Sequence, residues 1–176
     1  AEPFMVIATQ NPVEHHGTYP LPESQLDRFL LRLRIGYPDP TSEREILRRG
    51  GELPALQIRP VLSAAEVIEL QQQVPSVRVD ESIAEYILEI VGRTRSNDSL
   101  ALGVSPRGAQ ALYRAAQALA MLEGRHYVLP DDVKRLVVPV FAHRVVVDDR
   151  TAGMQRGSRA AERVLQQILS EIAVPL

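Results

Sequence analysis

The chain has 176 residues, of which 45% are hydrophobic and 24% are charged, and its formal net charge is −2 at pH 7. These values exclude a wholly disordered chain, and they give no general electrostatic attraction to nucleic acid or to membranes. The absence of cysteine excludes disulfides and thiolate catalysis and fits a reducing compartment, so we expect a cytoplasmic protein. No apolar run approaches the roughly 20 residues that span a bilayer, so we expect no membrane insertion.

The first part of the chain has the pattern of an α/β fold. An apolar run over Phe4–Ala8 predicts a short buried strand that ends before Asn11-Pro12. Proline and glycine residues then predict a loop, after which Pro22–Asp27 can begin a short helix. The sequence Leu-Arg-Leu-Arg-Ile within Phe29–Ile35 alternates with a period of two, which predicts a second strand. A proline-rich turn ends that strand, and we place the first domain boundary there.

Helix-capping signals dominate the rest of the chain. Thr41 or Ser42 is the expected cap of the first helix, the segment Ser63–Glu66 is a capping box, and Ser105 precedes the longest helix. We expect helices over 43–49, 64–73, 81–95, 106–124, 130–143 and 158–172, a loop over 96–104 and a short strand over 144–147. The sequence therefore predicts a mainly α-helical fold.

The basic residues are unusual because only one of them is lysine. Of 20 lysine and arginine residues, Lys134 is the single lysine. A Walker A loop grips nucleotide phosphates with a glycine-rich turn that ends in Gly-Lys-Ser/Thr. Lys134 lies in Asp-Asp-Val-Lys-Arg-Leu, with no glycine near it. The printed chain therefore contains no P-loop.

Asn11 is the first candidate site residue. It follows the first expected strand, at the carboxyl edge of a sheet, where ligands bind in open α/β folds. An amide at that position can hydrogen-bond a phosphate and orient an attacking water. The alternative is that Asn11 only starts a turn, as Asn-Pro often does.

Arg28 is the second candidate. The planar guanidinium of arginine makes bidentate contacts to phosphate, and an arginine supplied to a neighbouring active site can stabilise the charge that develops in phosphoryl transfer. The alternative is a local ion pair, for which Asp27, Glu23 and Asp39 are available.

Arg107 is the third candidate, and helix geometry supports it. It lies in the first turn of the longest expected helix, where backbone N–H groups and the helix dipole favour an anion. The apolar residues of that helix cluster on one side, nearly opposite Arg107. An outward arginine adds positive charge to an end that is already positive, so an anionic ligand would account for it. The alternative is a solvated arginine with no role.

Other polar groups carry weaker signals. His15 and His16 are adjacent, and the remaining histidines are distant in sequence, so we expect no metal site. Val145–Asp149 has the composition of a Walker B strand, but without a P-loop or a helical crossover we interpret it as a strand that ends in a turn. Asp131-Asp132 fits the start of a helix.

Five segments in a fixed order share motifs with one known family. They are Ala-Thr-Gln-Asn-Pro at 8–12, residues 17–29, Gly-Val-Ser-Pro-Arg-Gly at 103–108, Val-Leu-Pro-Asp-Asp-Val at 128–133 and His-Arg-Val at 143–145. They resemble the sensor 1 segment, the arginine-finger segment, the sensor 2 turn and two lid-domain signatures of the MoxR family of AAA+ ATPases. The match spans essentially the whole chain, and residues 17–29 are its most specific part.

The resemblance implies an ATP hydrolase that uses ATP and Mg²⁺ in the full-length protein and assembles as a homo-oligomeric ring, usually a hexamer. Asn11 would orient water at its own subunit's γ-phosphate, Arg107 would contact the same nucleotide from the lid, and Arg28 would reach into the neighbour's site. Such proteins act as chaperone-like motors that remodel partner proteins or insert metal cofactors into them, and the partners often contain a von Willebrand factor A domain.

The resemblance also implies three parts: residues 1–38 end an α/β core, residues 39–59 are a connecting helix and linker, and residues 60–176 are a helical lid domain. The family's Walker A and Walker B motifs precede sensor 1 and are absent, so we expect the fragment alone to hold no nucleotide tightly and to be inactive. The two expected strands would flank the missing P-loop strand. We therefore expect residues 1–36 to pair abnormally or between chains.

Two alternatives stay open. One is a non-catalytic helical module that binds a protein partner. The other is a magnesium-chelatase-like subunit from a related branch of the superfamily. The sequence pI of about 6.1 and the scattered arginines argue against a motor that tracks along DNA, so we expect no nucleic-acid partner.

Overall fold

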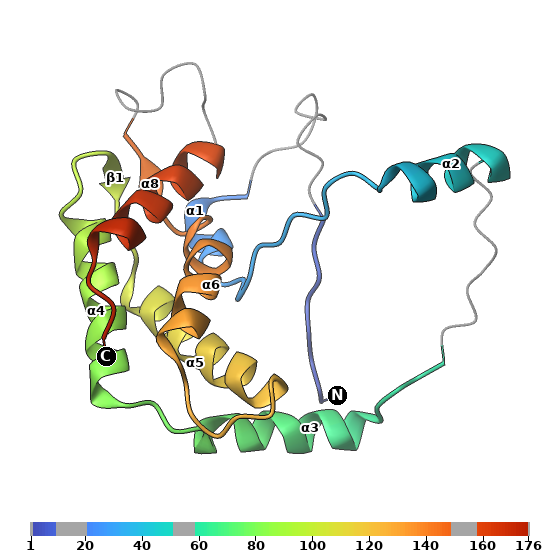
Figure 1. Cartoon of the computed structure of the whole chain (residues 1–176), viewed down its shortest axis with the longest axis horizontal. Helices are drawn as coiled ribbons and strands as arrows, with labels where there is room; N and C mark the ends of the chain where they lie inside the picture. The colour runs from blue at the N-terminus through green and yellow to red at the C-terminus, as the bar shows by residue number, and fades with distance from the viewer. Residues whose placement is uncertain (1, 10–20, 51–58, 149–157, 176) are drawn as a thin grey trace.

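The computed structural model describes residues 2–9, 21–50, 59–148 and 158–175. Within these ranges the chain is mainly helical, as the sequence predicts, with one two-stranded sheet. Figure 1 shows the elements in chain order: α1 (Glu23–Leu26), α2 (Pro40–Arg49), α3 (Ala64–Gln73), the 3₁₀ helix η1 (Val74–Ser76), α4 (Glu81–Arg95), β1 (Leu100–Leu102), α5 (Pro106–Leu122), α6 (Pro130–Phe141), β2 (Val146–Val147) and α8 (Ser158–Glu171).

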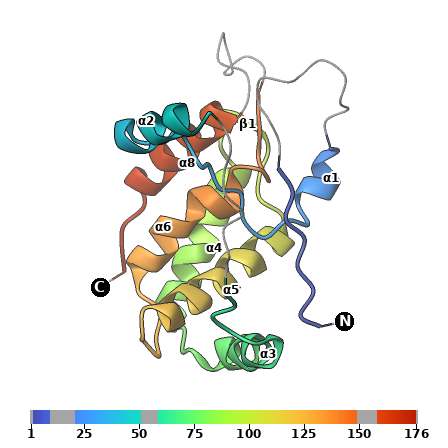
Figure 2. The same ribbon diagram turned by 90° about the vertical axis from the view of Figure 1, so that its right-hand side faces the viewer.

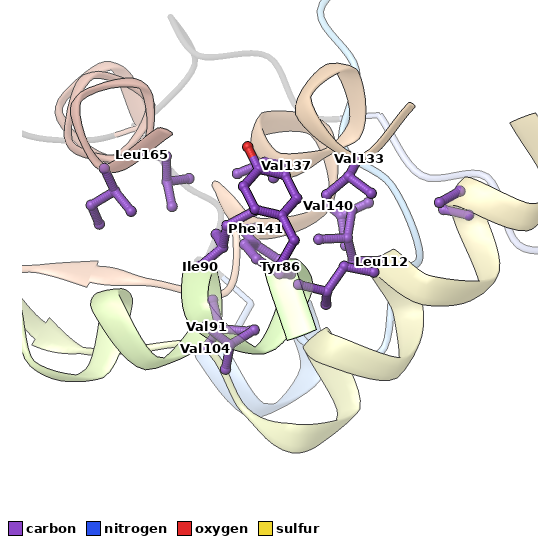
Figure 3. Packing of buried hydrophobic residues seen from close by; sticks show 14 of the residues in the cluster. Tyr86, Ile90, Val91, Val104, Leu112, Val133, Val137, Val140, Phe141 and Leu165 are labelled. Carbon is purple, nitrogen blue, oxygen red and sulfur yellow. The ribbon is translucent and has the colours of Figure 1, made fainter. Parts of the chain in front are cut away.

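Four helices build the hydrophobic core. Helix α5 packs against α4 and α6, and α8 packs against the same two helices (Figures 1 and 2). Figure 3 shows the centre of this core, where Tyr86 and Ile90 from α4 meet Leu112 from α5, Phe141 from α6 and Leu165 from α8. Burying each such side chain stabilises the fold by about 1.5–3 kcal/mol relative to exposure. The core thus fixes the ends of α5 and α6 relative to each other.

The capping signals in the sequence are confirmed, with one exception. Ser63 forms the expected capping box with Glu66, and Ser105 caps α5 by accepting the Gly108 N–H at 3.1 Å. Helix α2, however, is capped by Asp39 and not by Thr41 or Ser42, because the Asp39 carboxylate accepts both of their backbone N–H groups. Helix α2 consequently begins at Pro40, at the position where proline is well tolerated.

The helix bounds agree closely with expectation, and one loop is more ordered than expected. Helices α3 and α4 have the predicted bounds, while α5, α6 and α8 end one or two residues earlier. The expected loop over 96–104 contains strand β1, which pairs antiparallel with β2 and aligns Leu100 with Val147. A strand of three residues is too short to give a periodic signal, so only its tertiary partner reveals it.

The two strands expected in the first 38 residues are not strands in the structure. Phe4 is 82% exposed, so the first segment is not buried as predicted, and Ile35 at the end of the second segment is 98% exposed. An extended segment becomes a strand only by pairing, and neither segment has a ladder partner within the described ranges. Whether these residues pair between chains, and where the domain boundaries lie, stay predictions. No described helix is both long and apolar enough to cross a membrane.

Candidate functional site

Residues 27–32, which we call the docked segment, lie against the helical domain although more than 70 residues of sequence separate them. The Arg32 N–H donates to the Pro139 carbonyl at 2.9 Å. Pro139 lies in the last turn of α6, where the backbone carbonyls lack an N–H partner within the helix. The docked segment therefore supplies a donor to the end of α6.

Arg144 holds the docked segment through most of its N–H groups. Its Nε donates to Asp27 Oδ1 at 3.0 Å, and its two terminal nitrogens donate to the Asp27 and Leu30 carbonyls at 3.1 and 3.2 Å. The carbonyls of Phe29 and Val140 accept its remaining N–H groups. The Arg144 side chain is only 2% exposed, so these bonds replace nearly all of its hydration.

Asp27 joins the docked segment to the start of α5. Besides its ion pair with Arg144, the Asp27 carboxylate accepts the Ser105 hydroxyl, with oxygen–oxygen distances of 3.2 and 3.3 Å. Ser105 is the cap of α5, and Arg107 follows it by two residues. We call Asp27, Ser105 and Arg144 the docking cluster. It places the docked segment next to the first turn of α5.

Two glycines make this approach possible. A Cβ at Gly108 would lie 2.6 Å from Val104 Cγ1 and 3.0 Å from Arg144 Cδ. A Cβ at Gly103 would lie 2.7 Å from backbone atoms of α4. Both glycines of the Gly-Val-Ser-Pro-Arg-Gly motif are therefore needed for close packing, and Gly108 leaves the space that the Arg144 side chain fills.

His143 completes the contacts of Arg144. Its Nε2 lies 2.9 Å from the Phe29 carbonyl and 2.8 Å from Arg144 Nη1. Arg144 has five N–H groups and five oxygen partners, so we assign the imidazole proton to Nε2, from which it donates to the Phe29 carbonyl. Nδ1 then carries only a lone pair, and it is buried with no partner in the described part of the chain. His143 is therefore a neutral ring in this arrangement.

The environment of His143 predicts a pH dependence. Burial lowers the pKa of His143, and the charges of Arg144 and Arg32 lower it further, against the opposing effects of the Phe29 carbonyl and Asp27. A lowered folded-state pKa means that the unfolded chain binds more protons near pH 6.5 than the folded chain does. The stabilisation is therefore complete above about pH 6.5 and is lost as pH falls through the folded-state pKa.

We expect the free energy of unfolding of the chain to fall between about pH 7 and pH 5, and His143→Gln to remove part of that dependence. Urea denaturation at a series of pH values measures it. His126→Gln is the matched control, because His126 is exposed and lies outside the docked segment. Equal slopes for wild type and His143→Gln would contradict the assignment of a neutral His143.

The structure describes two of the three candidate residues. Arg28 is exposed, while Asp27 pairs with Arg144, so the proposed local pair between Asp27 and Arg28 does not form. Within the described ranges the Arg28 side chain has no ion pair. Arg107 is also exposed, as its place on the helix predicts, and its charge contributes to lowering the pKa of Arg144, after the larger effect of burial. Asn11 lies outside the described residues.

The residues that sequence reasoning missed are those that hold the site together. The sequence indicates His143 and Arg144 only as a lid signature, and Ser105 only as a helix cap.

The interpretation of Asp131-Asp132 as a helix start is confirmed for Asp132, which accepts the Leu129 N–H and pairs with Arg125 through both carboxylate oxygens. No cluster of potential metal ligands occurs among the described residues.

Two family models match the chain. The model of the AAA lid domain matches residues 92–168, which include Arg107 and Arg144. The model described as the ATPase family associated with various cellular activities matches residues 1–31, which include Arg28. The docking cluster therefore joins the two matched regions.

Relatives of known sequence and structure agree with these matches. The uncharacterized protein YeaC of Bacillus subtilis is 47% identical over 179 residues, which cover 100% of this chain and 54% of that protein. The chaperone MoxR1 of Mycobacterium tuberculosis is 38% identical over 98% of this chain and 47% of its own length. A crystal structure from Cytophaga hutchinsonii, assigned only provisionally as an ATPase, superposes with a TM-score of 0.85 at 34% identity and covers 100% of this chain and 56% of that one. The chain thus spans about half the length of the relatives it matches.

Proposed function

Since this chain belongs to the MoxR family of AAA+ ATPases, we propose that it forms the phosphate-sensing part of an ATP hydrolase that works as a ring of identical subunits. The observation that carries the proposal is the exposed Arg28 between two residues that the helical domain holds in place. Asp27 and Phe29 are fixed through their carbonyl groups, while the Arg28 guanidinium is exposed and has no ion-pair partner in the part of the chain that the structure describes.

Arg107 fits a nucleotide phosphate in the same subunit. It lies at the start of α5, where the unpaired backbone N–H groups and the helix dipole favour negative charge. Its guanidinium is exposed and has no ion-pair partner within the described ranges. In the proposal Arg107 is the sensor 2 residue, which contacts the phosphates of ATP from the lid domain and so reports the state of the nucleotide.

Arg28 fits the site of a neighbouring subunit. Arg144 binds the backbone carbonyls on both sides of Arg28, while the Arg28 side chain itself is exposed. In the proposal it is the arginine finger, whose charge stabilises the transferring phosphoryl group in the neighbour's site. Asn11 is the proposed sensor 1 residue, which orients the attacking water. ATP would supply the phosphoryl group, and Mg²⁺ would neutralise part of its negative charge.

The cellular role that we propose is chaperone-like remodelling of partner proteins, including cofactor insertion, in the cytoplasm. The relative MoxR1 of Mycobacterium tuberculosis is described as a chaperone. We propose hexameric rings and partners with a von Willebrand factor A domain as the working form. The printed chain has no P-loop lysine, so we propose that residues 1–176 alone do not hydrolyse ATP.

ATP turnover tests the proposal directly. Phosphate release is measured with Mg²⁺ for the full-length protein and for the chain of residues 1–176, and the size of each is measured by sedimentation. We expect turnover and a ring from the full-length protein and no turnover from the chain alone. Turnover by residues 1–176, or a monomeric full-length protein that does not respond to ATP, would contradict the proposal. The second result would favour a non-catalytic helical interaction module.

A further inference from the structure

The docked segment contains Arg28 and lies against the turn that contains Arg107. These two arginines are proposed to act at different nucleotide sites. We infer that the docking cluster of Asp27, Ser105 and Arg144 positions the arginine finger, so that the lid domain of one subunit sets where Arg28 lies in the next subunit's site. This inference rests on the proposed function. It assigns positioning roles to Ser105 and Arg144, which the family resemblance leaves without a role.

The first support is the way in which the backbone around Arg28 is held. Arg144 donates to the carbonyls of Asp27, Phe29 and Leu30, which lie on both sides of Arg28. The Arg28 N–H donates to the Gln25 carbonyl at 3.2 Å, at the end of α1. The Cα of Arg28 therefore cannot shift relative to the helical domain without breaking charge-assisted bonds, which are the stronger kind.

The second support is the position of Ser105. Its hydroxyl accepts the Gly108 N–H and donates to Asp27, so a single side chain links the start of α5 to the docked segment. Arg107, the proposed sensor 2 residue, lies between Ser105 and Gly108 in the same turn. A displacement of this turn, when Arg107 engages or releases a phosphate, is thus transmitted to Asp27 and to the backbone of its neighbour Arg28.

The third support is that the turn is itself rigid. Thr94, which is buried in α4, accepts the Val104 N–H at 3.0 Å, and Arg95 donates to the Val104 carbonyl at 2.9 Å. The absence of a side chain at Gly108 lets Arg144 pack directly on the turn. The turn, α4 and Arg144 therefore move as one body, and the docked segment moves with them.

The experiment uses the full-length protein and two variants that weaken the docking cluster differently. Ser105→Ala removes the link to Asp27 and the α5 cap. Ser63→Ala is its matched control, because Ser63 caps α3 and contacts no part of the docked segment. Asp27→Asn keeps the shape of the side chain and leaves the α5 cap in place but removes the charge that pairs with Arg144, so thermal unfolding of the variant is measured beside its activity. The turnover number, the ATP dissociation constant and the Hill coefficient are measured for each.

We expect Ser105→Ala and Asp27→Asn to lower kcat at least about tenfold, since misplacement of a catalytic group by about 1 Å costs as much as a hundredfold. For Asp27→Asn, which leaves the α5 cap in place, the ATP dissociation constant should stay near the wild-type value. The Hill coefficient should fall towards one for both variants, and Ser63→Ala should match wild type. Because the defect lies in the finger that is offered to the neighbour, mixing with Arg107→Ala subunits should restore turnover.

Two outcomes would overturn the inference, and they are distinguishable. If Ser105→Ala and Asp27→Asn keep wild-type kcat and Hill coefficient while Arg28→Ala loses turnover, the cluster has only a structural role and the proposed function stands. If Arg28→Ala also keeps turnover, Arg28 is not the finger, and both the inference and that part of the proposed function are wrong.

Discussion

Replacing Arg28 with alanine in the full-length protein is expected to lower kcat for ATP hydrolysis by about 10³-fold or more, with ATP binding nearly unchanged. Arginines that are supplied to a phosphoryl-transfer site contribute about 10³–10⁵ in rate, because their charge is matched to the transition state. ATP itself should still bind, since Arg28 would act on a neighbouring site. Phosphate release at saturating ATP and calorimetric titration of ATP measure the two quantities.

Two further variants make the Arg28 result specific. Arg93→Ala, which removes an exposed arginine from α4, is the matched control and should keep wild-type kcat. Arg28→Lys should recover only part of the rate, because an ammonium group keeps the charge but not the planar bidentate geometry. A kcat of Arg28→Ala that stays within a few-fold of wild type would contradict the assignment of Arg28 as the arginine finger.

The second large effect is expected at Arg107. Replacing it with alanine should weaken ATP binding by about ten- to a hundredfold, because hydrogen bonds to charged groups contribute about 1.5–3 kcal/mol. The dissociation constant of ATP for the full-length protein measures the loss. Arg114→Ala is the matched control, since Arg114 is an exposed arginine on the same helix and donates to Gln117. An unchanged ATP affinity in Arg107→Ala would exclude contact between Arg107 and the nucleotide.

Much of the helical fold could be predicted from local chemistry. A cap such as Ser63 or Ser105 satisfies backbone N–H groups within the next three residues, so its signal is complete in a short stretch of sequence. The outward position of Arg107 likewise follows from the apolar face of α5 alone. These predictions needed no partner from elsewhere in the chain, which is why the structure agrees with them.

Predictions that depended on distant partners were less successful. The apolar run at Phe4–Ala8 has strand-like composition, but composition cannot supply the neighbouring strand that a ladder needs, and Phe4 is exposed. Strand β1 was missed for the converse reason, because only its pairing with β2 makes Leu100–Leu102 a strand.

The candidate site likewise combines features that local sequence predicts with contacts that depend on distant residues. The exposed arginines were found from the sequence, but the residues that hold Arg28 in place were not. Arg144 lies 117 residues from Asp27, and its side chain meets the docked segment only because the core fixes α5 and α6 together. A buried arginine has no sequence pattern of its own, so His-Arg-Val at 143–145 could suggest a family but not a mechanism.

The central claim is that Arg28 completes a neighbour's site while Arg107 serves its own, and mixed rings test it most directly. Full-length Arg28→Ala and Arg107→Ala proteins are each assayed alone and then after mixing and reassembly. At an ATP concentration near the wild-type dissociation constant, each alone should be nearly inactive. In the mixture, an Arg28→Ala subunit keeps its own Arg107 and receives Arg28 from an Arg107→Ala neighbour, so ATP turnover should reappear. A mixture that stays as inactive as its two components would show that both arginines serve the same subunit's site, and it would contradict the account.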